Sequence, residues 1–320
     1  MKLMVKQPLV SILINNYNYD RFLPKAIESA LNQTYSPLEV IVVDDGSTDN
    51  SQEIIHNYGD KIVPILKQNG DHASTFNAGF SASQGEIICC LDADDRFLPE
   101  KVAQVIKIFN SYSEIGWCFH PLKLVNTKTE EFLGITRAFP ELEEDFSTLC
   151  DYRTQLQKGG LSFYPPSTSA LCFRRSLLQQ ILPMPEILKQ AADRYLTYSS
   201  LYLSPGFFLN RELTIQGIHS TNDGTLKQGQ KFRRRKARNQ IVAAYLLRSK
   251  FPKLVKFTNR LFARGSSYYL FNEVEKPEAK KFIDDYHQSV TLLSRLAIFL
   301  MTIYHSRPWK KAKLYKKKKS

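Results

Sequence analysis

The segment Glu86-Ile-Ile-Cys-Cys-Leu-Asp-Ala-Asp-Asp95 decides the fold. Its apolar part is typical of a buried strand, and carboxylates follow where that strand ends. Two earlier segments repeat the arrangement. The run Leu9–Ile14 leads into Asn15-Asn-Tyr17, and Leu38–Val43 leads into Asp44-Asp45. Each is a short apolar run without polar alternation, as expected for a strand covered on both faces of a parallel sheet.

Helical spacing separates these runs, and a further strand is predicted at 61–67. Strands that alternate with helices predict a parallel α/β sheet. In such sheets, ligands bind beyond the carboxyl ends of the strands, so one cleft would collect the three polar clusters. The common Gly-rich and P-loop nucleotide fingerprints are absent from the sequence. The helices are predicted at 23–31, 51–58, 72–83 and 99–110.

The spacing Asp92-Ala-Asp94 can bring two carboxylates to one divalent ion. Hard oxygen ligands suit Mg²⁺ or Mn²⁺, and a diphosphate would complete the shell. A solvated turn with a helix cap is the simpler alternative for this pair. At Asp44-Asp45, a carboxylate could accept a hydrogen bond from the ring N–H of a base, on which Tyr17 could stack.

Six segments together resemble the family 2 glycosyltransferases and occur in the family's order and spacing. They are Val10–Asn18, Ala30–Tyr35, Val40–Asp49, Ala78-Gly79, Gly85-Glu86 and Leu91–Asp95. The resemblance implies a GT-A type fold, with a Rossmann-like, mostly parallel sheet flanked by helices. It also implies a nucleotide-sugar donor, a divalent metal ion and inversion at the anomeric carbon.

The resemblance assigns the donor side by position. Asn15, Tyr17 and Asp45 match family residues around the nucleoside base, and Asp44 is their neighbour. Asn77 is expected to line the donor cleft.

On the metal side, Asp94 matches the principal metal ligand, and Asp92 matches a position near the ribose and the metal. His219 matches a histidine that could ligate the metal or contact the diphosphate, with a loop histidine as the alternative. Two positions depart from the family pattern. Gly217 stands where an arginine is expected, and Asp71 stands in a loop that usually carries glycine, so each puts a phosphate contact in doubt.

The resemblance places the general base on a carboxylate that opens a helix beside the acceptor, and Asp193 fits that position. An inverting transfer needs one base to take the proton of the acceptor hydroxyl. The alternative for Asp193 is a surface acid paired with Lys189 or Arg194.

The predicted activity is a metal-dependent, inverting, hexosyltransferase-like transfer from a nucleoside-diphosphate sugar, with UDP as the expected nucleotide. The acceptor would be a saccharide or a lipid-linked acceptor in surface polysaccharide or glycolipid synthesis. A non-catalytic relative that binds nucleotide sugars or serves as a scaffold is the alternative. A nucleotidyltransferase is disfavoured, because no Gly-rich, basic loop follows the first strand.

The 320-residue chain has a formal net charge of +13, which is distributed unevenly along the sequence. Residues 1–226 contain 19 Lys and Arg against 26 Asp and Glu, whereas residues 227–320 contain 25 against 5. We therefore predict a catalytic domain at 1–226, with a nucleotide-sugar half at 1–110 and an acceptor half at 111–226. A helical basic region follows at 227–320, with breaks near Ser266–Ser267 and at Pro277.

The basic region, with clusters at 233–236 and 316–319, could meet an anionic membrane surface or only water. Nucleic acid is disfavoured, because no aromatic RNA-binding motif accompanies the charge. Apolar residues from Leu292 to Tyr304 recur at helical spacing before the terminal lysines, as in an interfacial anchor. The sequence has five cysteines without a Cys-x-x-Cys motif, and it has no apolar leader or membrane-spanning segment. These features predict a cytoplasmic protein. The basic region adds the hypothesis of a peripheral position on the inner membrane face.

Overall fold

The computed structural model describes residues 7–136, 147–163, 165–220, 222, 229–270 and 277–306. The chain divides into two compact units. The first is Met1–Thr154 with Leu161–Asn222, and the second is Gln155–Gly160 with Asp223–Ser320. The predicted boundary between residues 226 and 227 lies outside the described residues. The short segment 155–160 belongs to the second unit, although it is far from that unit's other residues in sequence.

The first unit is built on an eight-stranded mixed sheet with the order β3-β2-β1-β4-β10-β6-β11-β9. Strands β3, β2, β1 and β4 are mutually parallel, and β10 runs antiparallel to both of its neighbours. This confirms the predicted α/β class with a mainly parallel sheet. The strands are β1 Val10–Asn16, β2 Leu38–Asp44, β3 Val63–Leu66, β4 Ile87–Asp92, β6 Trp117–Phe119, β9 Thr148–Cys150, β10 Leu171–Arg174 and β11 Gly206–Phe208.

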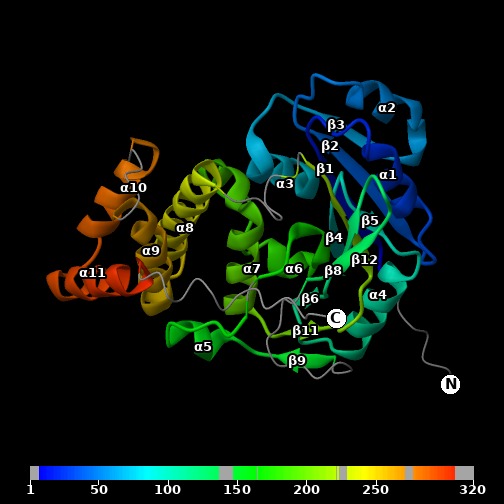
Figure 1. Cartoon of the computed structure of the whole chain (residues 1–320). Coiled ribbons are helices and arrows are strands. Elements are labelled where there is room, and N and C mark those ends of the chain that lie inside the picture. The colour runs from blue at the N-terminus through cyan, green and yellow to red at the C-terminus, as the bar shows by residue number, and fades with distance from the viewer. Residues whose placement is uncertain are drawn as a thin grey trace. The chain divides into compact units, whose positions relative to one another are not determined.

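Helices cover both faces of this sheet, as Figure 1 shows. Ile12, Ile14 and Cys89 share one apolar core with Ile27 of α1 and Val105 of α4. On α3, Gly79 lies against the side chains of Leu13 and Val43, which point to the opposite face. Alternate residues of each central strand are therefore buried on opposite sides. The helices of the first unit are α1 Leu23–Leu31, α2 Ser51–Asn57, α3 Asp71–Ala82, α4 Lys101–Ser111, α6 Arg175–Leu178 and α7 Ala192–Leu203. Helix α5, Arg153–Gln157, begins in the first unit and ends in the second.

A second, four-stranded sheet has the order β5-β12-β7-β8. Strand β5 directly follows the Asp92–Asp95 segment, and β12 ends at Ile218, one residue before His219. The small sheet thus delivers a distant part of the chain to the end of β4. Its strands are β5 Arg96–Phe97, β7 Lys123–Asn126, β8 Phe132–Ile135 and β12 Thr214–Ile218.

The second unit is helical in its described part. Helix α9 packs against both α8 and α11, and α10 packs against α8. The predicted break at Ser266–Ser267 is wrong, because α9 continues through both serines, whereas α10 does begin at Pro277. None of the helices in the described ranges combines the length and hydropathy needed to cross a bilayer. These helices are α8 Gln230–Lys250, α9 Val255–Leu270, α10 Pro277–Gln288 and α11 Leu292–Ser306.

Candidate functional site

The polar ends of β1, β2 and β4 lie side by side. Asn16 pairs in register with Asp44, and Asn15 pairs with Asp92. Asn15 and Asn16 are both buried, as is Asp44. Because parallel strands end at the same edge of the sheet, the three predicted clusters meet there.

Asp45 is held in place by groups that follow β3. Its Oδ1 accepts hydrogen bonds from Lys67 Nζ at 2.6 Å and from the backbone N–H of Gly70 at 3.0 Å. An open groove of about 520 Å³ runs past this point and is lined by residues 46–47, 52 and 66–69. Tyr17 lies 47% exposed after β1. Lys67 was missed in the sequence, where it reads as an ordinary surface lysine after an exposed strand.

Two predicted donor-side residues have their polar groups engaged within the fold. The fully buried Asp44 carboxylate accepts from the Ser47 backbone at 2.9 Å and from Asn16 Nδ2 at 2.8 Å, so it holds the turn after β2. The Asn77 amide exchanges two hydrogen bonds with the backbone of Met184, at 2.8 and 2.9 Å. Asn77 therefore ties α3 to the segment before α7.

Asp92 and His72 form one half of the site. His72 Nε2 lies 3.7 Å from Asp92 Oδ1 and 3.1 Å from Asn15 Nδ2. The pKa of Asp92 is raised to about 7, first by burial and also by the charges of Asp94 and Asp193, while His72 lowers it in part. The Asp92 backbone N–H donates to Ser169 Oγ at 3.0 Å, which ties the end of β4 to the segment before β10.

Asp94 and His219 form the other half. His219 Nε2 lies 3.0 Å from Asp94 Oδ2, and Asn222 Nδ2 donates to the same oxygen at 2.9 Å. The His219 ring stacks on Phe22 with centroids 4.4 Å apart, and Tyr19 meets it edge-on. Asn222 was not predicted as a site residue, although its spacing three residues after His219 was the available signal. The two carboxylates of the Asp-x-Asp pair thus face different histidines.

Asp193 lies in the first turn of α7 and accepts the backbone N–H of Arg194 at 2.7 Å. Its negative charge contributes to the raised pKa of Asp92, so the two carboxylates interact electrostatically. Lys189, considered in the sequence as a partner of Asp193, instead pairs with Asp71 at 3.7 Å. Lys189 and Asp71 both have positive φ angles, of 50° and 66°, in a region that non-glycine residues rarely adopt.

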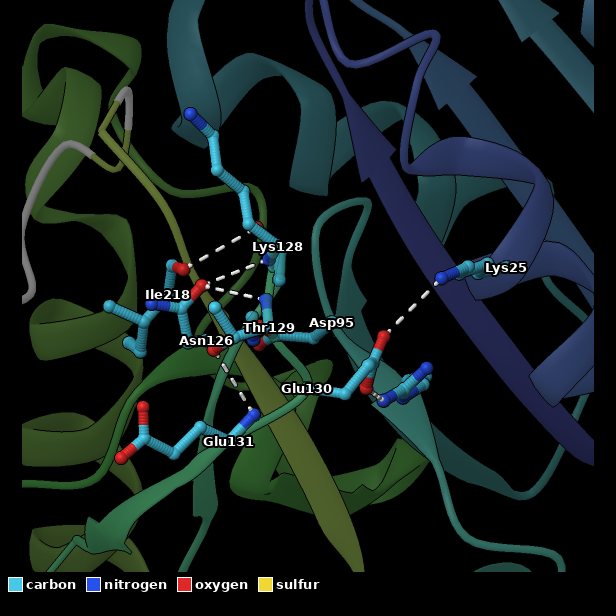
Figure 2. A network of polar contacts seen from close by, with 11 residues as sticks. Lys25, Asp95, Asn126, Lys128, Thr129, Glu130, Glu131 and Ile218 are labelled. Atoms are coloured by element: carbon cyan, nitrogen blue, oxygen red, sulfur yellow. Dashed lines mark hydrogen bonds and ion pairs between the residues drawn. The ribbon is translucent and has the colours of Figure 1, made fainter.

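The β7–β8 hairpin holds the backbone next to His219. The Asn126 side chain accepts from the backbone of Lys128 at 2.9 Å and of Thr129 at 3.3 Å, as Figure 2 shows. Thr127 then donates its backbone N–H and its hydroxyl to Ile218 O, at 3.1 and 3.4 Å. The residue after Ile218 is His219, so the hairpin fixes the backbone from which this imidazole projects.

Glycine is required at position 217 by close packing. A Cβ there would lie 2.3 Å from the backbone oxygen of Asp94, and the Gly217 N–H donates to buried Asp95 at 3.0 Å. The arginine that the family pattern predicts at this position therefore has no room in this fold.

Basic side chains lie near this position, around a cavity of about 90 Å³ that Asp94 and Gly217 help to line. Arg21, Lys25 and Arg96 line the same cavity. Glu130, on the hairpin tip, pairs with Arg96 and also with Lys25 at 3.5 Å, and the pair with Lys25 is drawn in Figure 2.

The potential metal-ligating atoms around Asp94 fit a divalent cation that also binds oxygen atoms of the substrate. Among the described residues, no three His, Cys, Asp or Glu side chains converge as a closed protein site. Mg²⁺ and Mn²⁺ are commonly held by one or two protein ligands with phosphate oxygens and water completing the shell. Asp94 Oδ2 and His219 Nε2 supply such a pair, and the His219 side chain is only 4% exposed.

Comparison of the fold shows which enzymes share it. S. aureus TarS 1–349, solved in complex with UDP-GlcNAc, matches with a TM-score of 0.65 and 17% identity, over 96% of this chain and 93% of that one. The mannosyltransferase PcManGT from Pyrobaculum calidifontis, in complex with GDP-Man and Mn²⁺, matches with a TM-score of 0.51 and 13% identity, over 96% and 88%. The likeness to TarS confirms the predicted GT-A type fold.

Sequence comparison finds glycosyltransferases at higher sequence identity. An uncharacterized glycosyltransferase of Nostoc sp. is 32% identical over 272 residues, which are 81% of this chain and 82% of the relative. One from Rickettsia prowazekii is 29% identical over 279 residues, 86% and 81% of the two chains. The family model described as glycosyl transferase family 2 matches residues 11–182. These matches, together with the fold, show that the chain belongs to glycosyl transferase family 2.

Proposed function

We propose that this chain is a metal-dependent, inverting glycosyltransferase that moves a hexosyl group from a UDP-sugar to an acceptor hydroxyl. The observation that carries the proposal is the contact between Asp94 and His219 at the end of β4, two residues after Asp92. Asp193, in the first turn of α7, lies near enough for its charge to help raise the pKa of Asp92. The TarS complexes with UDP-GlcNAc and with UDP support UDP as the nucleotide that carries the sugar.

The nucleoside would lie at the Asp45 end of the cleft. Asp45 Oδ1 is already bonded to Lys67 and Gly70, which orients the carboxylate and leaves its other oxygen to accept a base N–H. Tyr17 has the exposed ring needed for stacking on the base. Asn15, held by His72, would complete the wall between the nucleoside and the diphosphate.

The diphosphate would lie between the two carboxylate–histidine pairs. Asp94 and His219, with Asp92 close by, would hold Mg²⁺ or Mn²⁺, which when bound offsets the negative charge that develops on the leaving diphosphate. His72 would contact the donor from the side of Asp92, since its Nε2 already bridges Asp92 and Asn15.

Asp193 would act as the general base. Its carboxylate takes the proton of the acceptor hydroxyl while that oxygen forms a bond to the anomeric carbon. The bond from the anomeric carbon to the diphosphate oxygen breaks on the opposite face, and UDP leaves with the electron pair. Attack from that face inverts the anomeric configuration.

The acceptor would be a saccharide or a lipid-linked saccharide of a surface polysaccharide or glycolipid. A lipid-linked acceptor requires the enzyme to work at a membrane, and we place it peripherally on the inner, cytoplasmic face. The charge of residues 227–320, with 25 Lys and Arg against 5 Asp and Glu, supports that position.

A transfer and hydrolysis assay with UDP-GlcNAc and other UDP-sugars in Mn²⁺ tests the proposal. Asp94→Asn should abolish both reactions while the protein stays folded. Asp151→Asn is the matched control, because Asp151 is an exposed carboxylate that pairs with Arg153, two residues later. Donor binding without turnover by the wild type would instead favour a non-catalytic relative, and full activity of Asp94→Asn would overturn the site.

A further inference from the structure

Helix α11 presents an apolar face to solvent. Leu292 and Leu293 are 79% and 82% exposed, and Leu296 and Leu300 are both 58% exposed. Phe299 and Tyr304 on the same helix are 52% and 42% exposed. Large apolar side chains exposed together on one element mark an interaction surface rather than ordinary surface composition.

The opposite face of α11 explains why the helix is held in this orientation. Ile298 and Thr302, four residues apart, are buried, and α11 packs against α9 within the second unit, beside which it lies in Figure 1. At the start of the helix, Arg295 Nε donates to His287 O at 2.8 Å, which ties α11 to the end of α10. The helix is therefore anchored by one face, and its six exposed apolar side chains lie on the rest of its surface.

In sequence, the charged residues from the start of α11 onward all have one sign. Residues 292–320 contain nine Lys and Arg and no Asp or Glu. All five acidic residues of the 227–320 region occur between Glu273 and Asp285, before α11 begins. An apolar helix face continuous in sequence with a basic segment is the composition of helices that lie in the interface of anionic membranes.

We propose that the outer face of α11 docks onto a membrane surface that contains anionic lipid. The helix has 15 residues, so its length is about 22 Å at 1.5 Å per residue. That is shorter than the roughly 30 Å hydrocarbon core of a bilayer, so α11 lies along the interface. The leucines and Phe299 enter the acyl boundary, and the basic residues meet the lipid headgroups.

A second copy of the chain fits this face less well. A symmetric dimer built on α11 would bring two segments of nine basic residues together with no acidic residue in either to offset them. An anionic lipid surface supplies both the apolar phase and the opposite charge. The inference extends the proposed function, in which the acceptor is lipid-linked, but its test requires neither donor nor acceptor.

The test is flotation of the full chain with vesicles of equal parts phosphatidylcholine and phosphatidylglycerol, and with vesicles of phosphatidylcholine alone. The wild type should bind the anionic vesicles and bind the neutral ones at least about tenfold more weakly. The triple variant Leu293→Glu, Leu296→Glu and Leu300→Glu should lose anionic-vesicle binding by at least about tenfold. Replacing Lys316–Lys319 by serine should weaken binding to anionic vesicles only.

The matched control is a triple variant at exposed apolar positions of the first unit, Phe132→Glu, Leu149→Glu and Ile187→Glu, whose exposures are 53%, 46% and 44%. It should bind vesicles as the wild type does. Circular dichroism and melting temperature establish that each variant is folded. The proposal is overturned if the α11 variant binds anionic vesicles like the wild type. It is equally overturned if that variant changes only the oligomeric state in sedimentation. Failure of the wild type to catalyse glycosyl transfer would overturn the proposed activity, but it would not affect the conclusion on vesicle binding.

Discussion

His219 Nε2 lies 3.0 Å from Asp94 Oδ2, although the two residues are 125 positions apart in the chain. Strand β12 carries His219 to the end of β4. Asn222 then fixes both partners, since its amide contacts the Asp94 carboxylate, the His219 ring at 3.1 Å and the Gly217 carbonyl at 2.9 Å. Asp92 faces the other histidine, since its Oδ1 lies 3.7 Å from His72 Nε2.

The separation of the two histidines predicts different effects of their removal. His219→Gln should raise the Mn²⁺ concentration for half-maximal transfer by at least about tenfold, because the proposed metal loses a ligand. His72→Gln keeps the Asp94–His219 pair, so its metal requirement should match the wild type while the KM for the UDP-sugar rises. Titration of transfer rate against Mn²⁺ checks both variants. Equal metal requirements in the two variants would contradict the assignment.

The sheet core predicts the reactivity of the thiols. Cys89, Cys90, Cys118 and Cys172 are buried, and burial raises the pKa of Cys90 and Cys118 well above the usual range. A disulfide reagent must reach the sulfur atom, and all four thiols are buried, so these groups should stay inert in the folded protein. Titration with an aromatic disulfide at pH 8 should therefore detect Cys150 at most.

After unfolding in guanidinium, the same titration should detect all five cysteines of the sequence. Rapid reaction of more than one thiol before denaturant is added would contradict the burial of the central strands.

The parts of the fold predicted from sequence are those with local causes. The helix predicted at 23–31 is α1, with the same limits, because its apolar spacing and Pro24 in the first turn act within a few residues. The strands before Asp44 and Asp92 were found for the same reason. The start of α7 has a less local cause, because a 3₁₀ segment Glu186–Ala191 precedes it and Lys189 within that segment adopts a positive φ.

What sequence patterns did not reveal depends on contacts between distant residues. Lys67 has ordinary local surroundings in sequence, and Asn222 has only its spacing from His219 as a signal. The fold places Lys67 against Asp45 and Asn222 against Asp94. The pairing of Asp71 with Lys189 is of the same kind, since it joins the start of α3 to the segment before α7. Such contacts are not encoded in hydrophobic periodicity, which reports only which face of an element is buried.

Gly217 offers a test of how tightly the two sheets approach each other. Gly217→Ala would place a Cβ 2.3 Å from Asp94 O and 2.9 Å from Thr127 Cγ2, so the Asp94 backbone must shift. Overpacking of this kind costs about 1–3 kcal/mol, and the shift should also reduce transfer. Gly160→Ala is the matched control, because the nearest atom to its Cβ lies at 3.6 Å. Melting temperature and transfer rate measured together check the prediction, and a Gly217→Ala protein with wild-type values of both would contradict it.

Asp193 provides the sharpest separation of chemistry from binding. Asp193→Asn keeps the size of the side chain and removes the base, so kcat should fall by about 10²- to 10⁴-fold. The KM for the UDP-sugar should change little, because the proposed nucleoside contacts lie at the Asp45 end of the cleft. Glu186→Gln, an exposed carboxylate on the segment leading to α7, is the control and should keep the wild-type kcat.

Steady-state kinetics at saturating acceptor measure both constants for these variants. Since the Asp193 charge contributes to the raised pKa of Asp92, its removal should also lower that pKa. A surface acid without a role in transfer would leave kcat unchanged in Asp193→Asn. That outcome would move the base to another carboxylate while the donor site stayed as proposed.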